Sequence, residues 1–318
     1  MKHLFTMLLT LVAVTASAQD FEVDGIYYNI LSEDDRTVEV TENPNDYAGD
    51  VVIPGEVTYD GSTYSVTTIG DYAFSDCYAL TSVDMPSVTT IGDVAFGYCS
   101  ALTSVDMPSV TTIGAYAFYE CSSLTSISMP SVTTIGGYAF YNCNALTSVS
   151  MPSATTIGYG AFYYCFALTS IDIPASVSMI DDYAFAICSS LTSVYCHWED
   201  PLECDPNFYE TVLENAILYV PKGTIDAYRS VSPWSGFVNI VERDYSGIAD
   251  ATAPEVVIKV IDGAIVIEGG DMAVSAPVVE VYSAGGVCVY RGTDSSIGGL
   301  GRGVYVVKVG GTVQKVAL

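Results

Sequence analysis

The chain has 318 residues, of which 50% are hydrophobic and 15% are charged, and its formal net charge is −27 at pH 7. No lysine or arginine occurs between Arg36 and Lys222, so the centre of the chain has no side chain that could neutralise phosphate groups. We therefore expect neither nucleic acid nor an anionic membrane as a partner. The acidic surplus is expected to keep a half-apolar protein soluble and monomeric, with a basic partner or divalent cations as alternatives.

The first residues, 1–18, have the features of a secretory signal peptide. A positive charge at Lys2 precedes a short apolar run from Leu4 to Ala16, and small residues follow up to Ala18. The apolar run is shorter than the roughly 18 residues that span a bilayer, and no later run is long enough. We expect cleavage after Ala18 and a protein that is secreted, extracellular or held at the outer cell surface, without membrane insertion.

Residues 19–68 are predicted to form an N-terminal β cap. Apolar and polar residues alternate along several short runs there, which is typical of strands with one buried face. Asp60-Gly61 between two such runs indicates a tight hairpin turn. A cap is needed because a repeat array exposes the apolar side of its first coil.

Residues 69–196 repeat with a period of 22, and once of 23. Each unit reads I-G-x-x-A-F-x-x-C-x-x-L-T-S-V-x-M-P-S-V-T-T. A unit this short cannot bury its own apolar side, so six coils are expected to stack around one core. Leu80, Val83 and Met85 alternate with polar residues as in a strand, which the next proline ends, and residues 88–91 are predicted as a second extended arc. The units begin at Ile69, Ile91, Ile113, Ile135, Ile157 and Ile180.

The segment from Ile69 to Pro86, which reads IGDYAFSDCYALTSVDMP and recurs five more times, resembles the BspA-type class of bacterial leucine-rich repeats. As in that class, the cysteine precedes the leucine. The resemblance covers 69–196 and implies a solenoid at the bacterial cell surface. Its implied function is non-enzymatic and adhesin-like, the binding of host or environmental proteins or glycans. The alternative is a structural or envelope-assembly repeat protein without a specific ligand.

Residues 197–244 are predicted to form the C-terminal cap. The run 216–221 is expected to be a last strand, and Thr224 to cap a short helix. Trp234 and Phe237 are expected to close the core.

A linker at 245–253 and a separate module at 254–318 follow the cap. The module has six short strand-like runs separated by glycine-rich turns, which predicts a small β-sandwich. The order of these runs is similar to that of C-terminal sorting domains of type IX secretion. The predicted fold class is therefore mostly β: a capped leucine-rich-repeat solenoid of six coils, followed by a small sandwich.

Residues for catalysis or metal binding are scarce. His197 is the one histidine after the signal peptide, and with Cys196 and Cys204 it lacks a fourth zinc ligand at a recognised spacing. We expect no catalytic residue, no metal and no cofactor. Cys196 and Cys204 form the one pair considered for a disulfide, with free thiols as the alternative. The six cysteines of the repeat column are expected to be reduced and buried.

Tyrosine is abundant, with 24 copies, and several occupy the two variable positions between the repeat phenylalanine and the cysteine, with Phe166 close by. On successive coils they would form an aromatic strip that could contact a protein or a sugar. The alternative is that they only pack on one another. The strip is favoured over the strand side, which carries mainly serine and aspartate, and its central contact is placed at Tyr119, Tyr141 and Tyr163. Its residues are Tyr98, Tyr119, Tyr141, Tyr163, Tyr164 and Phe166.

Overall fold

The computed structural model describes residues 19–205 and 207–245, and seven short segments of the C-terminal part. The expected signal peptide and nearly all of the expected linker lie outside the described residues. The chain divides into two compact units, Met1–Tyr245 and Ser246–Leu318. The C-terminal segments are 257–261, 264–268, 279–283, 288–292, 296–298, 300–309 and 312–317.

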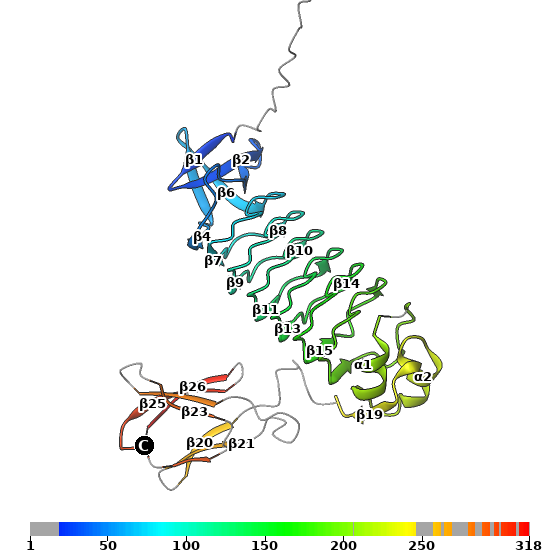
Figure 1. Ribbon diagram of the computed structural model, residues 1–318. Coiled ribbons are helices and arrows are strands. Elements are labelled where there is room, and N and C mark those ends of the chain that lie inside the picture. Colours follow the sequence, from blue (N-terminus) through cyan, green and yellow to red (C-terminus); the bar gives the residue numbers. More distant parts are fainter. Residues whose placement is uncertain are drawn as a thin grey trace, which may run out of the picture. The chain divides into compact units, whose positions relative to one another are not determined.

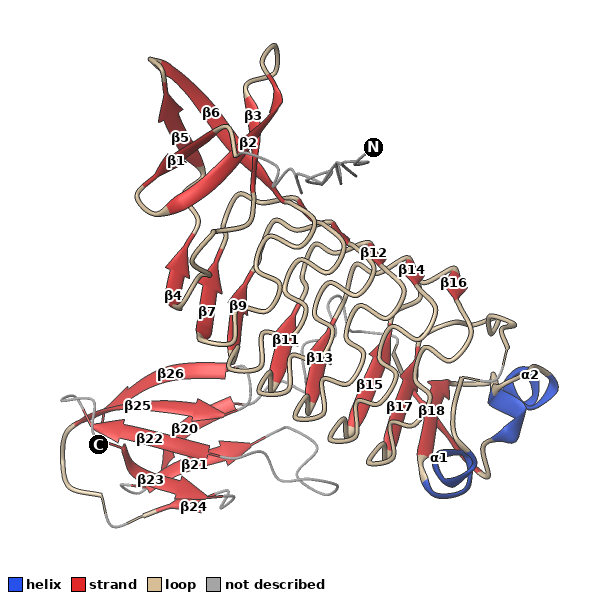
Figure 2. Ribbon diagram, turned by 45° about the horizontal axis from the view of Figure 1, so that its top comes forward, coloured by secondary structure: helices blue, strands red, loops and turns tan. Residues whose placement is uncertain are grey.

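The first unit is a leucine-rich-repeat solenoid of about eight turns, which confirms the predicted fold class (Figure 1). A row of short parallel strands runs along one side of it (Figure 2) and consists of three hydrogen-bonded sheets, β4-β7-β9, β11-β13 and β15-β17-β18-β19. Within the repeats, each paired strand lies opposite the equivalent residues of the next coil. We call this row the strand side. Its members are β4 (Gly49–Val52), β7 (Leu80–Asp84), β9 (Ser104–Asp106), β11 (Ser126–Ser128), β13 (Ser148–Ser150), β15 (Ser170–Ile173), β17 (Ser193–Cys196), β18 (Ile217–Pro221) and β19 (Asn239–Arg243).

A second parallel row forms where the sequence predicts the second extended arc. Each of its two-residue strands pairs isoleucine with isoleucine or threonine with threonine across several coils. The row continues from the N-terminal strand β6 (Ser62–Ile69). Its repeat members are β8 (Thr90–Ile91), β10 (Thr112–Ile113), β12 (Thr134–Ile135), β14 (Thr156–Ile157) and β16 (Met179–Ile180).

The turn side of each coil, after the isoleucine, contains a third row of hydrogen bonds. The backbone N–H groups of Tyr72, Phe74 and Asp76 donate to carbonyls of the next coil at 3.0, 2.7 and 2.8 Å. Two tight turns per coil put a residue in the left-handed region, at the third and seventh positions after the isoleucine. The third-position residues have φ between 55° and 60° and are Tyr72, Val94, Tyr116, Tyr138, Gly160 and Tyr183.

The core is built from columns of identical side chains. The repeat phenylalanines, from Phe74 to Phe185, stack with centroids 4.9 to 5.6 Å apart and planes within 14° of parallel. Tyr47 of the N-terminal cap closes one end of this column, and Phe208 closes the other. The column therefore extends beyond the six predicted coils, because each cap contributes an aromatic ring in register.

The N-terminal cap contains the predicted strands and hairpin. Asp60-Gly61 joins two antiparallel strands, and both residues have positive φ. The strand β4 of this cap already pairs with the first repeat strand on the strand side, so the array begins before Ile69. The cap strands are β1 (Phe21–Val23), β2 (Ile26–Ser32), β3 (Thr37–Val40), β4, β5 (Glu56–Tyr59) and β6.

The C-terminal cap adds two in-register strands, β18 and β19, and three short helices: α1 (Glu210–Asn215), α2 (Ile225–Ser230) and η1 (Trp234–Gly236). Trp234 and Phe237 are buried as predicted. The expected capping by Thr224 is wrong in its mechanism. Thr224 is the residue before α2, but its hydroxyl donates to the carbonyl of Pro221 at 2.7 Å and does not accept from the helix.

The second unit contains two antiparallel sheets. One joins β20 (Val257–Ile261), β21 (Ala264–Glu268) and β24 (Ser296–Ile297). The other joins β22 (Val279–Ser283), β23 (Cys288–Gly292), β25 (Val304–Val309) and β26 (Thr312–Ala317). Buried side chains of both sheets form one cluster, which includes Ile265 and Val281. The sequence did not predict β24, which is too short to show alternation, and the sandwich arrangement stays a prediction.

Candidate functional site

The turn side of the solenoid gathers aromatic side chains into one connected surface, which we call the tyrosine patch. Ring contacts with centroids 4.4 to 6.3 Å apart link its members across five successive coils. All six strip residues predicted from the sequence belong to it. Its members are Tyr98, Tyr116, Tyr119, Tyr138, Tyr141, Tyr159, Tyr163, Tyr164, Phe166 and Tyr183.

The predicted central residues form a stack of their own. Tyr119 and Tyr141 have centroids 4.9 Å apart at 9°, and Tyr141 and Tyr163 are 5.6 Å apart at 12°. All three are half-buried. Because their faces lie against one another, they present mainly ring edges and hydroxyl groups to solvent. The same side chains therefore pack on their neighbours and remain partly exposed.

A second column of tyrosines, which the sequence analysis missed, lies beside this stack. Tyr116 and Tyr138 stack with centroids 5.0 Å apart, and Tyr159 and Tyr183 continue the column through steeply inclined rings. Tyr116, Tyr159 and Tyr183 are each between 38% and 48% exposed. The signal was present in the sequence, since tyrosine recurs at the second or third position after the repeat isoleucine.

The two columns border an open hollow of about 410 Å³ that is lined by tyrosine side chains. We call it the tyrosine hollow. Several of its rings meet at steep angles, such as 83° between Tyr141 and Tyr164. The rings that line it therefore do not share one orientation. The lining residues are Tyr138, Tyr141, Tyr159, Tyr163, Tyr164 and Tyr183.

Burial opposes ionisation of four phenols of the patch, those of Tyr119, Tyr138, Tyr141 and Tyr163. Partial burial raises the pKa of Tyr138 to about 12, and a hydrogen bond with Tyr159 adds to the rise. Burial also raises the pKa of Tyr141 and Tyr163. Glu120 contributes in the same direction at Tyr119 and Tyr141, because its negative charge opposes ionisation of a neighbouring phenol. The patch is thus a neutral phenol surface beside negative charge.

The side chains of the strand side are mostly short and polar, as expected. Its C-terminal end, however, carries aromatic and basic side chains. Tyr195 and Tyr219 stack with centroids 4.6 Å apart, and the Arg243 guanidinium lies 5.5 and 6.0 Å from the two ring centroids. His197 lies beside them and pairs with Asp172 at 2.7 Å. The histidine therefore has a carboxylate partner on the protein surface.

The cysteines of the repeats are buried thiols. The Sγ–H groups of Cys99, Cys121, Cys143, Cys165 and Cys188 donate to phenylalanine carbonyls of the preceding coil at 3.0 to 3.2 Å. Burial raises the pKa of the Cys143 thiol to about 12. Cys196 and Cys204 are also free, so the disulfide considered for this pair is not formed in the structure.

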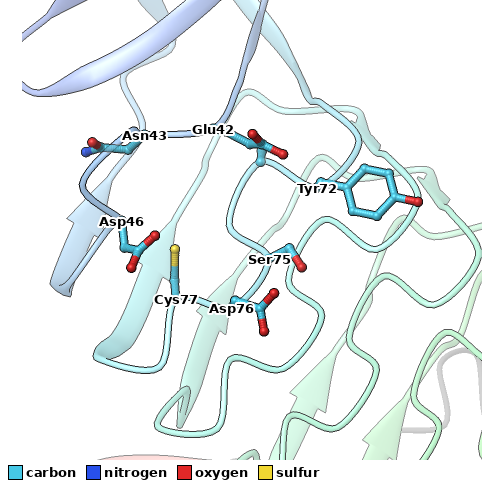
Figure 3. A pocket seen from close by; sticks show the side chains of 8 residues that line it. Glu42, Asn43, Asp46, Tyr72, Ser75, Asp76 and Cys77 are labelled. Carbon is cyan, nitrogen blue, oxygen red and sulfur yellow. The ribbon is translucent and has the colours of Figure 1, made fainter. Parts of the chain in front are cut away.

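A second hollow, of about 300 Å³, lies between the N-terminal cap and the first coil (Figure 3). Glu42, Asp46 and Asp76 give it an acidic rim, and Tyr72 and Cys77 also line it. Within the part of the chain that the structure describes, no three histidine, cysteine or carboxylate side chains are placed to hold a metal ion. The same described residues include no helix of the length and apolarity that a bilayer span requires.

The repeat geometry defines the first unit as a leucine-rich-repeat protein of the solenoid type. A family model, the BspA type leucine rich repeat region, matches residues 62–165 and 111–218 in six copies. The repeat region of this chain therefore belongs to the BspA-type family. Proteins with such repeats are typically found at the cell surface and are generally non-enzymatic, and the family indicates a repeat-based binding or structural role.

Several solved structures are similar to this chain. A leucine rich cell surface protein from Faecalibacterium prausnitzii is 23% identical over 69% of this chain and 72% of its own, with a TM-score of 0.48. A leucine-rich repeat protein from Bacteroides ovatus is 26% identical over 71% of each chain, with a TM-score of 0.42. A leucine rich repeat protein from T. pallidum is 22% identical over 67% of this chain and 95% of its own, with a TM-score of 0.43. No curated protein matches the chain.

Proposed function

We propose that the protein is exported and acts outside the cell as an adhesin-like binder of extracellular proteins or glycans, with the tyrosine patch as its contact surface. The signal-peptide pattern at 1–18 and the resemblance of the C-terminal module to type IX sorting domains support export. The family's association with the cell surface supports the same location.

One observation carries the choice of surface. The repeat columns bury their phenylalanine, leucine and isoleucine side chains, yet the patch exposes Tyr98, Tyr116, Tyr159, Phe166 and Tyr183 by 38% to 48% each. A contiguous exposed aromatic surface on a soluble protein usually marks an interaction site. Tyrosine is also enriched among the residues that contribute most to binding energy.

Binding of the secreted chain to immobilised extracellular matrix proteins and to mucin tests this proposal. We expect saturable binding that persists in roughly 0.5 M salt, where the Debye length is about 4 Å and surface charge attraction is largely screened. A chain with a purely structural role would show no saturable binding to either class of ligand.

Substitution of Tyr116 and Tyr183 by serine locates the contact. Both rings are exposed, so their loss should leave the fold intact while it weakens binding at least tenfold, or about 1.4 kcal/mol. The matched control is Tyr72→Ser, because Tyr72 is 51% exposed at the equivalent position of the first coil, outside the patch. Equal affinity of the double variant and the control would contradict the assignment of the patch.

A further inference from the structure

The tyrosine hollow is an open depression whose six lining tyrosine rings have mixed inclinations. Tyr163 is inclined by 85° to Tyr164 and by 80° to Tyr183, with centroids 4.4 and 6.3 Å apart. Tyr159 meets Tyr183 at 64°. Rings of such different orientations bring aromatic surface and hydroxyl oxygens together at one hollow, and both attract a cation.

The electrostatic surroundings favour the same ligand. No lysine or arginine lies between Arg36 and Lys222, so no basic side chain of the repeats competes for the hollow. Glu120 lies close enough to Tyr119 and Tyr141 to raise the pKa of both phenols. The hollow is therefore a neutral aromatic site in a strongly negative protein, to which cations are drawn over long range.

The stacking pattern disfavours a flat sugar platform. A sugar ring that stacks on tyrosine needs a free aromatic face. The parallel pairs Tyr116–Tyr138 and Tyr119–Tyr141 cover their faces with one another. A hollow of about 410 Å³ has room for a lysine or arginine side chain.

From these features we infer that the hollow receives a lysine or arginine side chain of a basic protein segment. The inference rests on the proposed function and specifies the ligand class of its contact surface. The cation would lie against the tyrosine rings of the hollow. Charge complementarity would speed the encounter, and the cation–π contacts would give the site its preference for a basic side chain.

Two basic peptides and a neutral control peptide of the same length test this inference. Each is added to the secreted full chain. The probes are acetyl-(Gly-Lys)4-amide and acetyl-(Gly-Arg)4-amide, and acetyl-(Gly-Gln)4-amide is the neutral control. We expect both basic peptides to bind in roughly 0.5 M salt and the glutamine peptide to bind at least tenfold more weakly. Equal binding of all three would overturn the inference. Tighter binding of tetramethylammonium chloride than of either basic peptide would also overturn the assignment to a protein side chain.

Variants of two exposed lining residues separate cation–π binding from general attraction to acid. Tyr159→Leu and Tyr183→Leu retain apolar volume but remove the aromatic face, and should weaken lysine-peptide binding at least fivefold. Tyr159→Phe and Tyr183→Phe should bind as the parent does. Tyr72→Leu, outside the hollow, is the matched control. Unchanged binding by the leucine variants, with an unchanged circular dichroism spectrum, would overturn the inference.

The two proposals fail in different ways. Patch-dependent binding to matrix or mucin without any preference for the basic peptides would leave the proposed function standing and refute the cation site. Absence of binding to matrix, mucin and all peptides would refute both.

Discussion

Gly160 lies against the ring of Tyr138, so close that a Cβ atom at position 160 would be 2.7 Å from Cε1 of that ring. Other coils carry tyrosine or valine at the equivalent position with nearly the same positive φ. In this coil the preceding residue, Tyr159, supplies the ring instead, so the glycine leaves room for the column to continue.

Gly160→Ala should therefore lower the free energy of unfolding by about 2 kcal/mol, partly from the left-handed backbone and mainly from the collision. Urea unfolding measures the change. Gly25→Ala is the matched control, because Gly25 has φ of 81° but no atom within 4 Å of an added Cβ. If Gly160→Ala lowered the free energy of unfolding by no more than Gly25→Ala does, backbone strain alone would account for the change.

Cys143→Ala should destabilise the solenoid by about 1 to 2 kcal/mol. The change removes a fully buried thiol and its hydrogen bond to the Phe118 carbonyl, and leaves a small void in the middle of the column. Cys204→Ala, at a partly exposed thiol of the cap, should have a smaller effect. Equal effects in chemical denaturation would argue against tight packing of the thiol column.

Stability should fall as the pH rises above 9. The pKa of the Cys143 thiol rises from 9.0 to about 12 on folding, so between these values the unfolded chain loses a proton that the folded chain keeps. That difference favours the unfolded state as pH increases. Thermal melting from pH 8 to pH 11 measures the decline, which Cys143→Ala should make shallower. A melting temperature that is independent of pH over this range would contradict the buried-thiol assignment.

The secreted protein should begin at Gln19. The pattern of small residues that ends at Ala18 predicts cleavage there. Intact-mass analysis of protein collected from the culture medium checks the site. Secreted material that retains Met1 would refute cleavage, and protein confined to the cytoplasm would refute export.

The repeat columns were predictable because each coil repeats the same side chain at the same place, so Phe74 and Cys77 define the interior of the later coils. The missed tyrosines, Tyr116 and Tyr138, are a different case. Their recurrence after the repeat isoleucine was visible in the sequence, but the left-handed backbone at these positions, which a hydrophobic period does not encode, was not. The helix α1 was missed because six residues in a cap are too few for a helical pattern.

The hydrogen-bond row on the turn side fixes the distance from one coil to the next, and with it the spacing of the surface tyrosines. Insertion or loss of one whole repeat would lengthen or shorten the aromatic surface by a single ring step of about 5 Å, without any change in the local fold of its neighbours. The number of repeats therefore sets the length of the aromatic surface. The number of contacts with a long ligand can change one repeat at a time, while each contact keeps its geometry.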